Sequence, residues 1–299
     1  MITRKSYFIS EGERCAASLH LPERVNSSRN LPSILMIYGW GGIQNSFLVP
    51  FRNHFVKLGF AVMTFDFRTW GESAGSPRHL ISVPGRLADA EAALAHLRTQ
   101  PDIDPSAIIL WGSSLGGGMA FTLGEKHPEL KGIIAQVPLL DGKVASSRTP
   151  LRPRLRIALY ALVDSLRGSN PLYVPIVAPE GSFGTMTRDN AVKAKEEGAR
   201  IYGPGAPNFI AARSALTMLS YRPIRSLGQV VPRTLVIGGT SDTIAPFDEK
   251  AVRAFNNPSL EIVTIDASHF EPYLEPHLSR NLAIQSAFLA TLVTAAKVA

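Results

Sequence analysis

The stretch from Ile108 to Gly118, IILWGSSLGGG, constrains the fold of this chain more than any other. A run of β-forming residues leads into the pattern Gly-x-Ser-x-Gly, and a helix-compatible segment follows it. A serine at such a strand-to-helix turn has a strained backbone, so the residues two positions before and after it must be small. Gly112 and Gly116 meet this requirement for Ser114, whereas Ser113 is one position out of register. We therefore expect the Ser114 hydroxyl to lie above a sheet, at a helix N-terminus that favours developing negative charge.

The alternative is a Gly/Ser-rich turn without chemistry, and composition alone does not decide between the two. The chain has 299 residues, of which 45% are hydrophobic and 18% are charged, as in an ordinary globular protein. This length fits one large α/β domain with an insertion, or two small domains. The net charge of +7 is spread along the chain without a dense basic run, so we expect no nucleic-acid partner.

The cellular setting is expected to be the cytoplasm. Cys15 is the only cysteine, which excludes an intrachain disulfide and fits a reducing compartment. The first residues have no apolar core of signal-peptide length, and no uninterrupted apolar run reaches membrane-spanning length. We therefore expect a soluble protein with no membrane partner.

Strands and helices alternate along both ends of the sequence. Compact apolar runs predict buried strands, and apolar residues at helical spacing predict helices. An antiparallel hairpin is expected over residues 7–21. Further strands are expected at 33–38, 60–65, 107–111, 132–137, 234–238 and 261–266, and helices at 47–58, 87–98 and 278–296. This alternation implies right-handed crossovers and a mostly parallel central sheet flanked by helices, an α/β fold.

Between Pro138 and Pro232 this alternation stops. The segment is rich in proline, shows no clear central strand, and looks helical at 151–166, 188–197 and 208–219. Because strands resume directly after it, an insertion is favoured over a separate helical domain. The prediction is therefore an α/β core formed by residues 1–140 and 228–299, with a helical cap insertion at 141–227 that covers the catalytic edge.

A serine hydroxyl is a poor nucleophile near neutral pH unless an oriented base takes its proton. In parallel sheets, ligands bind at the carboxyl ends of the strands, so the base is expected there. Of the seven histidines, His269 directly follows the last expected strand, and Asp242 follows the strand before it. Asp248 and Asp266 are the rival acids. Asp66 also follows a strand but precedes the elbow, so it is expected to organise a loop, held by Arg68 or by nearby amides.

Ser114, Asp242 and His269 occur in the order nucleophile, acid, histidine, which is the α/β-hydrolase order. In this hypothesis His269 accepts the Ser114 proton, and Asp242 holds the imidazole in the required tautomer. Two backbone N–H groups are expected to stabilise the oxyanion. One is that of Leu115, directly after the nucleophile, and the other is that of Trp40, in the loop after the strand at 33–38.

Several segments resemble the α/β-hydrolase superfamily, and the resemblance covers nearly the full length. They are 66–73 (DFRTWGES), 110–118, 135–142 (AQVPLLDG) and 269–273 (HFEPY), with 208–215 and 221–223 in the insertion. The chain is most similar to the group that holds bacterial dienelactone-hydrolase-like and peptidase-like proteins together with fungal polyketide transferases and thiohydrolases. This resemblance implies an α/β-hydrolase fold and a metal-independent serine hydrolase or acyltransferase. One departure is Tyr38-Gly39, where most relatives have His-Gly.

The main functional hypothesis is hydrolysis of a small-molecule carboxylic ester or thioester through an acyl-Ser114 intermediate. Acyl transfer to an alcohol or amine is the alternative within the same chemistry, and peptidase action is suggested only by distant relatives. A non-catalytic ligand-binding protein is the alternative from another class, and the complete triad argues against it. Dehalogenases and epoxide hydrolases normally carry an aspartate at the elbow, so Ser114 disfavours both.

The substrate pocket is expected to be apolar. Its expected lining is Tyr38, Leu139, Phe183, Met186, Phe209, Tyr221 and Phe270, although packing between cap and core is the alternative for each of them. Arg213 and Arg222 are expected in structural ion pairs rather than on an anionic ligand. No metal-ligand spacing, phosphate loop or dinucleotide fingerprint occurs, so no metal or cofactor is expected. The oligomeric state stays open, a homodimer included.

Overall fold

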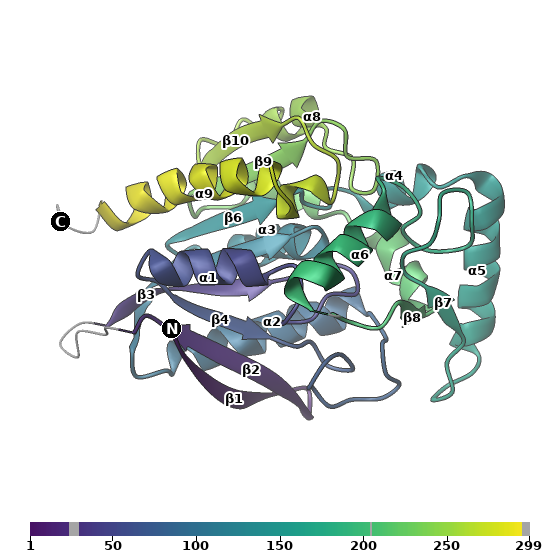
Figure 1. The fold of residues 1–299 in the computed structure, drawn as a ribbon, viewed down its shortest axis with the longest axis horizontal. Helices are drawn as coiled ribbons and strands as arrows, with labels where there is room; N and C mark the ends of the chain where they lie inside the picture. The colour runs from purple at the N-terminus through teal and green to yellow at the C-terminus, as the bar shows by residue number, and fades with distance from the viewer. Residues whose placement is uncertain (24–29, 204, 295–299) are drawn as a thin grey trace.

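A twisted sheet runs through the centre of the molecule (Figure 1). Within residues 1–23, 30–203 and 205–294, which the computed structural model describes, eight strands form this sheet in the order β1-β2-β4-β3-β5-β6-β9-β10. The strands are β1 (Ile2–Ser10), β2 (Glu13–Leu21), β3 (Leu31–Ile37), β4 (Ala61–Phe65), β5 (Ile103–Ser113), β6 (Gly132–Gln136), β9 (Thr234–Gly239) and β10 (Leu260–Ile265).

The pairing confirms the predicted α/β arrangement. β1 and β2 form the expected antiparallel hairpin, which turns at Glu11 and Gly12 with φ of 46° and 83°. β2 also pairs with β4 in antiparallel fashion, whereas all other neighbours in the sheet are parallel. β4, β6 and β9 are buried at every residue, as expected for strands covered on both faces.

Helices cover both faces of the sheet. α1 (Val49–Lys57) and α9 (His277–Thr294) contact each other on the face nearer the viewer in Figure 1, and α2 (Val83–Arg98) and α3 (Leu115–Lys126) contact each other behind it. α2 begins before the predicted residue 87 because the Ser82 side chain accepts a hydrogen bond from the N–H of Gly85 and so caps the helix. The last two residues of the predicted C-terminal helix, 295 and 296, lie outside the described residues.

Buried side-chain amides fasten α9 to the centre of the sheet. The Trp111 indole N–H donates to Gln285 Oε1 at 2.7 Å, and the amide groups of Gln285 and Asn281 donate to Gln136 Oε1 at 2.9 and 2.7 Å. Gln136 ends β6 and Trp111 lies near the end of β5, so this network joins the last helix to the strands on either side of the elbow. Buried side-chain hydrogen bonds of this kind favour one packing arrangement, although the Gln136 Nε2 has no partner among the described residues.

The segment between β6 and β9 lies beyond one end of the sheet in Figure 1. It contains α4 (Gly142–Ser147), α5 (Leu151–Ser165), β7 (Tyr173–Pro175), α6 (Ala191–Tyr202), β8 (Phe209–Ala211), α7 (Ser214–Ser220) and the 3₁₀ helix η1 (Pro223–Gly228). The predicted helix at 151–166 is confirmed. α5 exposes leucines on its outer side, and its inner side includes the buried residues Ala161 and Asp164.

Two predictions in this segment are wrong at their boundaries. Residues 208–211 were expected to open a helix, but 209–211 form β8, which pairs with β7 in a small antiparallel sheet. The cause is Asn208, whose side chain bonds both the N–H and the C=O of Val177 and so holds the chain extended. The second wrong boundary is the start of α6. This helix begins at Ala191 rather than at residue 188, because Asp189 and Asn190 adopt left-handed φ values of 55° and 52°.

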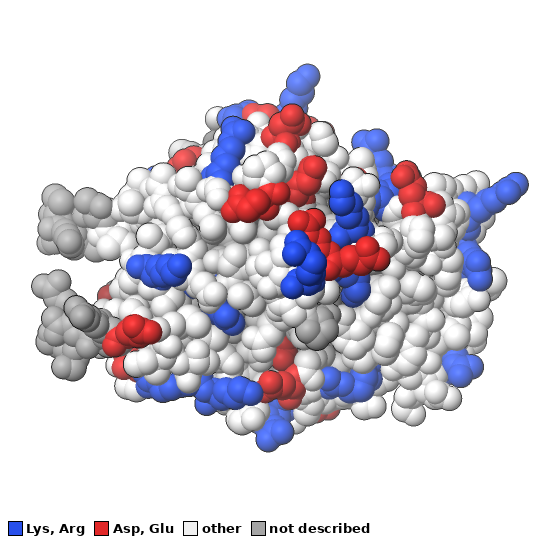
Figure 2. Space-filling view, viewed as in Figure 1, with Lys and Arg blue, Asp and Glu red and all other residues white. Residues whose placement is uncertain are grey.

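Charged residues are scattered over the visible surface. Figure 2 shows Lys and Arg interspersed with Asp and Glu on this face, so the net charge of +7 does not form one continuous patch there. Among the helices of the described residues, none combines the length and apolarity needed to cross a bilayer.

The turn between β5 and α3 has the backbone that the opening motif predicts. Ser114 has φ 55° and ψ −123°, a region that side-chain-bearing residues rarely occupy. Its N–H donates to the Gln136 carbonyl at 3.0 Å, and its C=O accepts from the Leu139 N–H at 2.9 Å. A Cβ at Gly112 would lie 2.3 Å from the Gly116 carbonyl oxygen, and one at Gly116 would lie 2.1 Å from the Ile37 carbonyl oxygen. Both positions therefore admit only glycine.

Replacing Gly116 with alanine is expected to destabilise the fold. The new methyl group would overlap backbone of β3, which cannot move without disturbing the sheet, so we expect a loss of about 3 kcal/mol or more in the free energy of unfolding. Gly85→Ala is the matched control, because its nearest neighbours would lie 3.5 Å from the new Cβ. Urea unfolding of the two variants and the wild type measures the effect, and equal midpoints for both variants would contradict the packing described here.

Candidate active site

Three side chains from three loops form one hydrogen-bonded chain at the carboxyl ends of the strands. Ser114 Oγ lies 3.0 Å from His269 Nε2, and His269 Nδ1 lies 2.6 Å from Asp242 Oδ2. Ser114 follows β5, Asp242 follows β9 and His269 follows β10, so neighbouring parts of one parallel sheet bring them together. His269 and Asp242 are buried, with 2% and 6% of their surface exposed. This is the geometry of a nucleophile, a base and the group that orients the base.

Backbone N–H groups orient the Asp242 carboxylate toward the imidazole of His269. Its Oδ1 accepts from the N–H groups of Ile244 and Ala245 at 2.9 and 2.7 Å, which leaves Oδ2 for His269. Two backbone donors and one imidazole N–H thus set the orientation of the carboxylate. Asp248, one rival acid, instead caps α8 (Glu249–Arg253), and Asp266, the other, accepts from the hydroxyl of Thr240 on the exposed surface.

The pKa of His269 is raised above its ordinary value of 6.5. Burial is the largest single influence and lowers this pKa, but the charge of Asp242 and its hydrogen bond to the imidazole, together with the charge of Asp189, outweigh it. The site thus favours the imidazolium more than water does. Such a shift suits a base that must hold a proton part-way through a reaction.

The loop after β3 passes directly beside Ser114. A Cβ on Gly39 would lie 2.8 Å from Ser114 Cβ, so this residue too must lack a side chain. The Gly39 carbonyl accepts a 2.8 Å hydrogen bond from Arg86 Nη1. Because a trans peptide directs its N–H opposite to its C=O, this bond also sets the direction of the Trp40 N–H. The Trp40 indole donates to Thr185 Oγ1 at 3.1 Å, which anchors the loop to the segment between β6 and β9.

Arg86 was not found from the sequence, although it supports this loop. It is 2% exposed, its guanidinium stacks on the Phe67 ring at 4.4 Å, and burial lowers its pKa to about 10. Its Nε and Nη2 have no hydrogen-bond partner among the described residues. Helical spacing could have indicated that Arg86 is buried. It lies three residues after Val83 and four before Ala90, on the buried side of α2.

Asp66 organises the same loop, as expected, but Arg68 does not hold it. The carboxylate accepts from the Gln44 N–H, the Gln44 side-chain amide and the Tyr38 hydroxyl at 2.9, 3.0 and 3.1 Å. Arg68 instead pairs with Asp89 at 2.6 Å. Burial, followed by the charge of Asp66, raises the pKa of Tyr38 well above its ordinary value. Tyr38 therefore acts as a neutral hydrogen-bond donor to Asp66.

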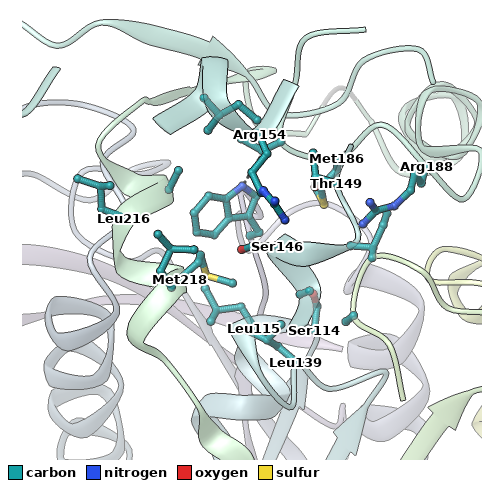
Figure 3. Close-up of a pocket in the computed structure, with 18 of the residues that line it drawn as sticks. Ser114, Leu115, Leu139, Ser146, Thr149, Arg154, Met186, Arg188, Leu216 and Met218 are labelled. Atoms are coloured by element: carbon teal, nitrogen blue, oxygen red, sulfur yellow. Dashed lines mark hydrogen bonds between the residues drawn. The ribbon is translucent and has the colours of Figure 1, made fainter. Parts of the chain in front are cut away.

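Two hollows meet at Ser114, and four predicted pocket residues line them. The larger has a volume of about 940 Å³ and is lined by Trp40, Leu115, Leu139 and Met186 among others (Figure 3). The smaller, of about 490 Å³, is lined by Tyr38, Met186, His269, Phe270 and other residues. The larger hollow is mainly apolar, and Ile157, Leu216, Met218, Leu219 and Ile244 add to its wall without having been predicted.

Three predicted pocket residues line neither hollow, because each is held elsewhere. Phe183 packs on Tyr160, with ring centroids 4.9 Å apart. The Phe209 ring packs on His79 at 4.8 Å and on Tyr173, at the surface end of β8. The Tyr221 hydroxyl is hydrogen-bonded to Thr122 at 2.9 Å and faces α3.

The two arginines that were expected in ion pairs are found in ion pairs. Arg213 Nε lies 2.8 Å from Asp164, and Arg222 Nε lies 2.5 Å from Asp141. Each pair fastens a loop of the segment between β6 and β9. In the described ranges, no group of three or more histidine, cysteine, aspartate or glutamate side chains has an arrangement that could hold a metal ion.

A family model and several known proteins match most of this chain in sequence. Residues 39–267 match the family described as serine aminopeptidase, S33. The quorum-quenching protein AidA of Acinetobacter baumannii (strain MDR-ZJ06) is 31% identical over 291 residues, which cover 96% of this chain and 94% of AidA. The thiohydrolase AneE of Aspergillus aculeatus is 28% identical over 234 residues, 74% of this chain and 72% of its own length.

A solved structure supports the fold independently of sequence. The α/β hydrolase GrgF from Penicillium sp. sh18 superposes with a TM-score of 0.76 at 19% identity, covering 97% of this chain and 98% of GrgF. At this identity the likeness establishes the α/β-hydrolase fold and says nothing about substrate.

Removing the charge of Asp242 is expected to lower the pKa of His269. Burial then dominates, so we expect the pKa to fall from above 6.5 in the wild type to below 6.5 in Asp242→Asn. NMR titration of the imidazole signals, with His269→Gln used for assignment, measures both values. Asp248→Asn is the control and should leave the pKa of His269 unchanged. An unchanged pKa in Asp242→Asn would contradict the coupling of the two side chains.

Proposed function

The chain belongs to the serine aminopeptidase S33 family of α/β hydrolases, and from this premise we propose that it cleaves a carboxylic ester or thioester through an acyl-Ser114 intermediate. The observation that carries the proposal is the hydrogen-bonded chain from Ser114 through His269 to Asp242. A serine in this position is exposed to substrate at the meeting point of two hollows, because Ser114 lines both of them.

The proposed reaction follows from this geometry. His269 Nε2 takes the Ser114 proton as Oγ attacks the acyl carbon, and Asp242 stabilises the imidazolium that forms. The N–H groups of Leu115 and Trp40 bind the oxyanion of the tetrahedral intermediate, and one such donor lowers the barrier by about 3 kcal/mol. His269 then gives its proton to the leaving alcohol or thiol as the bond to it breaks. Water, activated by the same imidazole, attacks the acyl-enzyme and releases the acid.

The two hollows suit the two halves of the substrate. The base must protonate the leaving group, so the leaving group belongs in the smaller hollow, which His269 lines. The acyl group then extends into the larger, mainly apolar hollow beside Trp40 and Leu115.

We propose that residues 141–227 act as a cap over a core of residues 1–140 and 228–299. Support comes from the lining of the larger hollow, to which α4, α5 and α7 contribute Ser146, Ile157 and Leu216. Ion pairs within the segment, between Arg213 and Asp164 and between Arg222 and Asp141, make it a structural unit of its own. The identity of the acyl group would then depend on the cap more than on the core.

Acyl transfer is the second candidate function. AneE is named a thiohydrolase, and a further relative, ClaH of Penicillium crustosum, is named a polyketide transferase and is 28% identical over 242 residues. The smaller hollow offers a place beside His269 where an acceptor alcohol or amine would replace water. Transfer and hydrolysis share the acyl-Ser114 step and differ only in what attacks it.

Aminopeptidase action is disfavoured despite the name of the family. A free α-amino group needs a carboxylate to bind it, and no aspartate or glutamate lines either hollow within the described residues. Arg154 and Arg188 line the larger one instead, so a substrate ammonium group would meet like charge.

Labelling by a fluorophosphonate probe together with turnover of ester and thioester panels tests the proposal. Wild type should react with the probe and hydrolyse p-nitrophenyl esters or N-acetylcysteamine thioesters. Ser114→Ala should lose both activities, by roughly 10³-fold or more. Ser113→Ala is the matched control, one position out of register, and should still be labelled. Equal labelling of wild type and Ser114→Ala would overturn the role of Ser114, and a folded wild type inert to probe and esters would favour a ligand-binding protein.

A further inference from the structure

The larger hollow combines an apolar wall with two cationic side chains. Arg154 of α5 and Arg188, which precedes α6, both line it, and Figure 3 shows their guanidinium groups turned into the space over Ser114. Neither forms an ion pair within residues 1–23, 30–203 and 205–294, in contrast to Arg213 and Arg222 of the same segment.

Arg188 is fixed in place but has unused hydrogen-bonding capacity. Its Nη2 donates to the Thr243 carbonyl at 2.8 Å, while its buried Nε has no partner among the described residues. Burial, the largest cause, lowers the pKa of Arg188, and the charge of Asp189 offsets this only in part. A buried donor without a partner costs free energy unless a ligand supplies the acceptor.

Arg154 reaches the hollow from α5 (Figure 3). Among the described residues, the one hydrogen bond of its side chain is a long 3.5 Å contact from Nη1 to the Ser147 carbonyl, so most of its donors have no partner there. The hydroxyl-bearing residues Ser146 and Thr149 line the hollow near it and offer further donors. A guanidinium with adjacent hydroxyl donors matches the planar, multiple-acceptor geometry of a carboxylate.

The charges of Asp189, Asp242 and Glu180 act on Arg188, but among the described residues no carboxylate forms an ion pair with Arg188 or Arg154. Asp242 is occupied by His269, Ile244 and Ala245. Asp189 accepts from the N–H and the hydroxyl of Thr243 and, at 3.4 Å, from the N–H of His269. The hollow itself is lined by two positive charges and by no negative one within the described chain. Its field therefore favours an anionic ligand group.

We propose that the acyl group accepted by Ser114 ends in an anionic group, a carboxylate or a phosphate, that Arg154 and Arg188 bind in the apolar hollow. The inference rests on the proposed acyl-serine function and specifies its substrate. In this proposal the middle of the acyl chain packs on the apolar side chains of Leu139, Met186 and Met218. The anionic end of the chain forms hydrogen bonds with the guanidinium groups of Arg154 and Arg188.

Matched esters with one leaving group test this proposal. Mono-p-nitrophenyl esters of α,ω-dicarboxylic acids with six, eight and ten carbons are compared with p-nitrophenyl alkanoates of the same chain lengths. For at least one length, we expect kcat/KM to be about tenfold or more higher for the charged ester, the usual effect of a charge-assisted hydrogen bond. A p-nitrophenyl ester of 6-phosphonohexanoic acid distinguishes a phosphate-type end from a carboxylate.

Arg154→Gln and Arg188→Gln are each expected to remove most of this preference, measured within each variant as the ratio of kcat/KM for the charged ester to that for the neutral ester of the same length, mainly by raising the KM of the charged ester. Arg152→Gln, an exposed position on the same helix, is the matched control and should keep the preference. Raising the salt concentration should weaken the preference in the wild type.

The outcomes separate this inference from the proposed function. Turnover of neutral esters without any preference for the anionic series, or a preference that both arginine variants retain, overturns the inference and leaves the hydrolase standing. If neither series is hydrolysed, the proposed function fails. Calorimetry with monomethyl suberate and methyl octanoate then still decides the anion site, since Arg154 and Arg188 should favour the charged compound and equal binding would overturn the inference.

Discussion

The left-handed backbone of Ser114, with φ 55°, is the constraint on which the rest of the structure depends. This conformation exposes the hydroxyl between a strand and a helix, and it requires the strand and the helix to approach closely. Gly112 and Gly116 permit that approach, because a Cβ on Gly112 would lie 2.3 Å from the Gly116 carbonyl oxygen. A Cβ on Gly116 would in turn lie 2.1 Å from the Ile37 carbonyl oxygen of β3. The Ser114 N–H donates to the Gln136 carbonyl, and the Ser114 carbonyl accepts from the Leu139 N–H, so the turn is held against the end of β6. The amide network around Gln136 extends this support to α9.

Buried polar groups set the position of the second half of the site. Arg86 donates a hydrogen bond to the Gly39 carbonyl in the loop after β3. Asp66 accepts hydrogen bonds from Tyr38 and Gln44, at the two ends of the same loop. A charged guanidinium in the core is costly to desolvate, and its stack on Phe67 and its bond to Gly39 offset part of this cost. These contacts hold the loop in one position, and electrostatic stabilisation of an oxyanion requires donors that are positioned in advance.

The sequence predicts the parallel strands well, because buried strands are compact apolar runs, a local signal. Asp242 and His269 were selected because each lies shortly after such a run, and the structure brings both side chains into one hydrogen-bonded chain with Ser114. The segment between β6 and β9 is predicted less well, since its structure depends on contacts between residues distant in sequence. The extended form of residues 208–211 results from the side-chain bonds of Asn208 to Val177. Arg154 and Arg188 could not be told from other surface arginines until the fold placed both in one hollow.

Trapping of the acyl-enzyme tests the central claim most directly. A p-nitrophenyl ester in excess is mixed with the protein, quenched with acid during turnover, and the digested chain is mapped by mass spectrometry. The account predicts the acyl group on Ser114, together with a burst of p-nitrophenol equal to the amount of protein when deacylation is slower than acylation. Ester turnover that leaves Ser114 unmodified at every quench time, or an acyl group carried by Ser113, would contradict it.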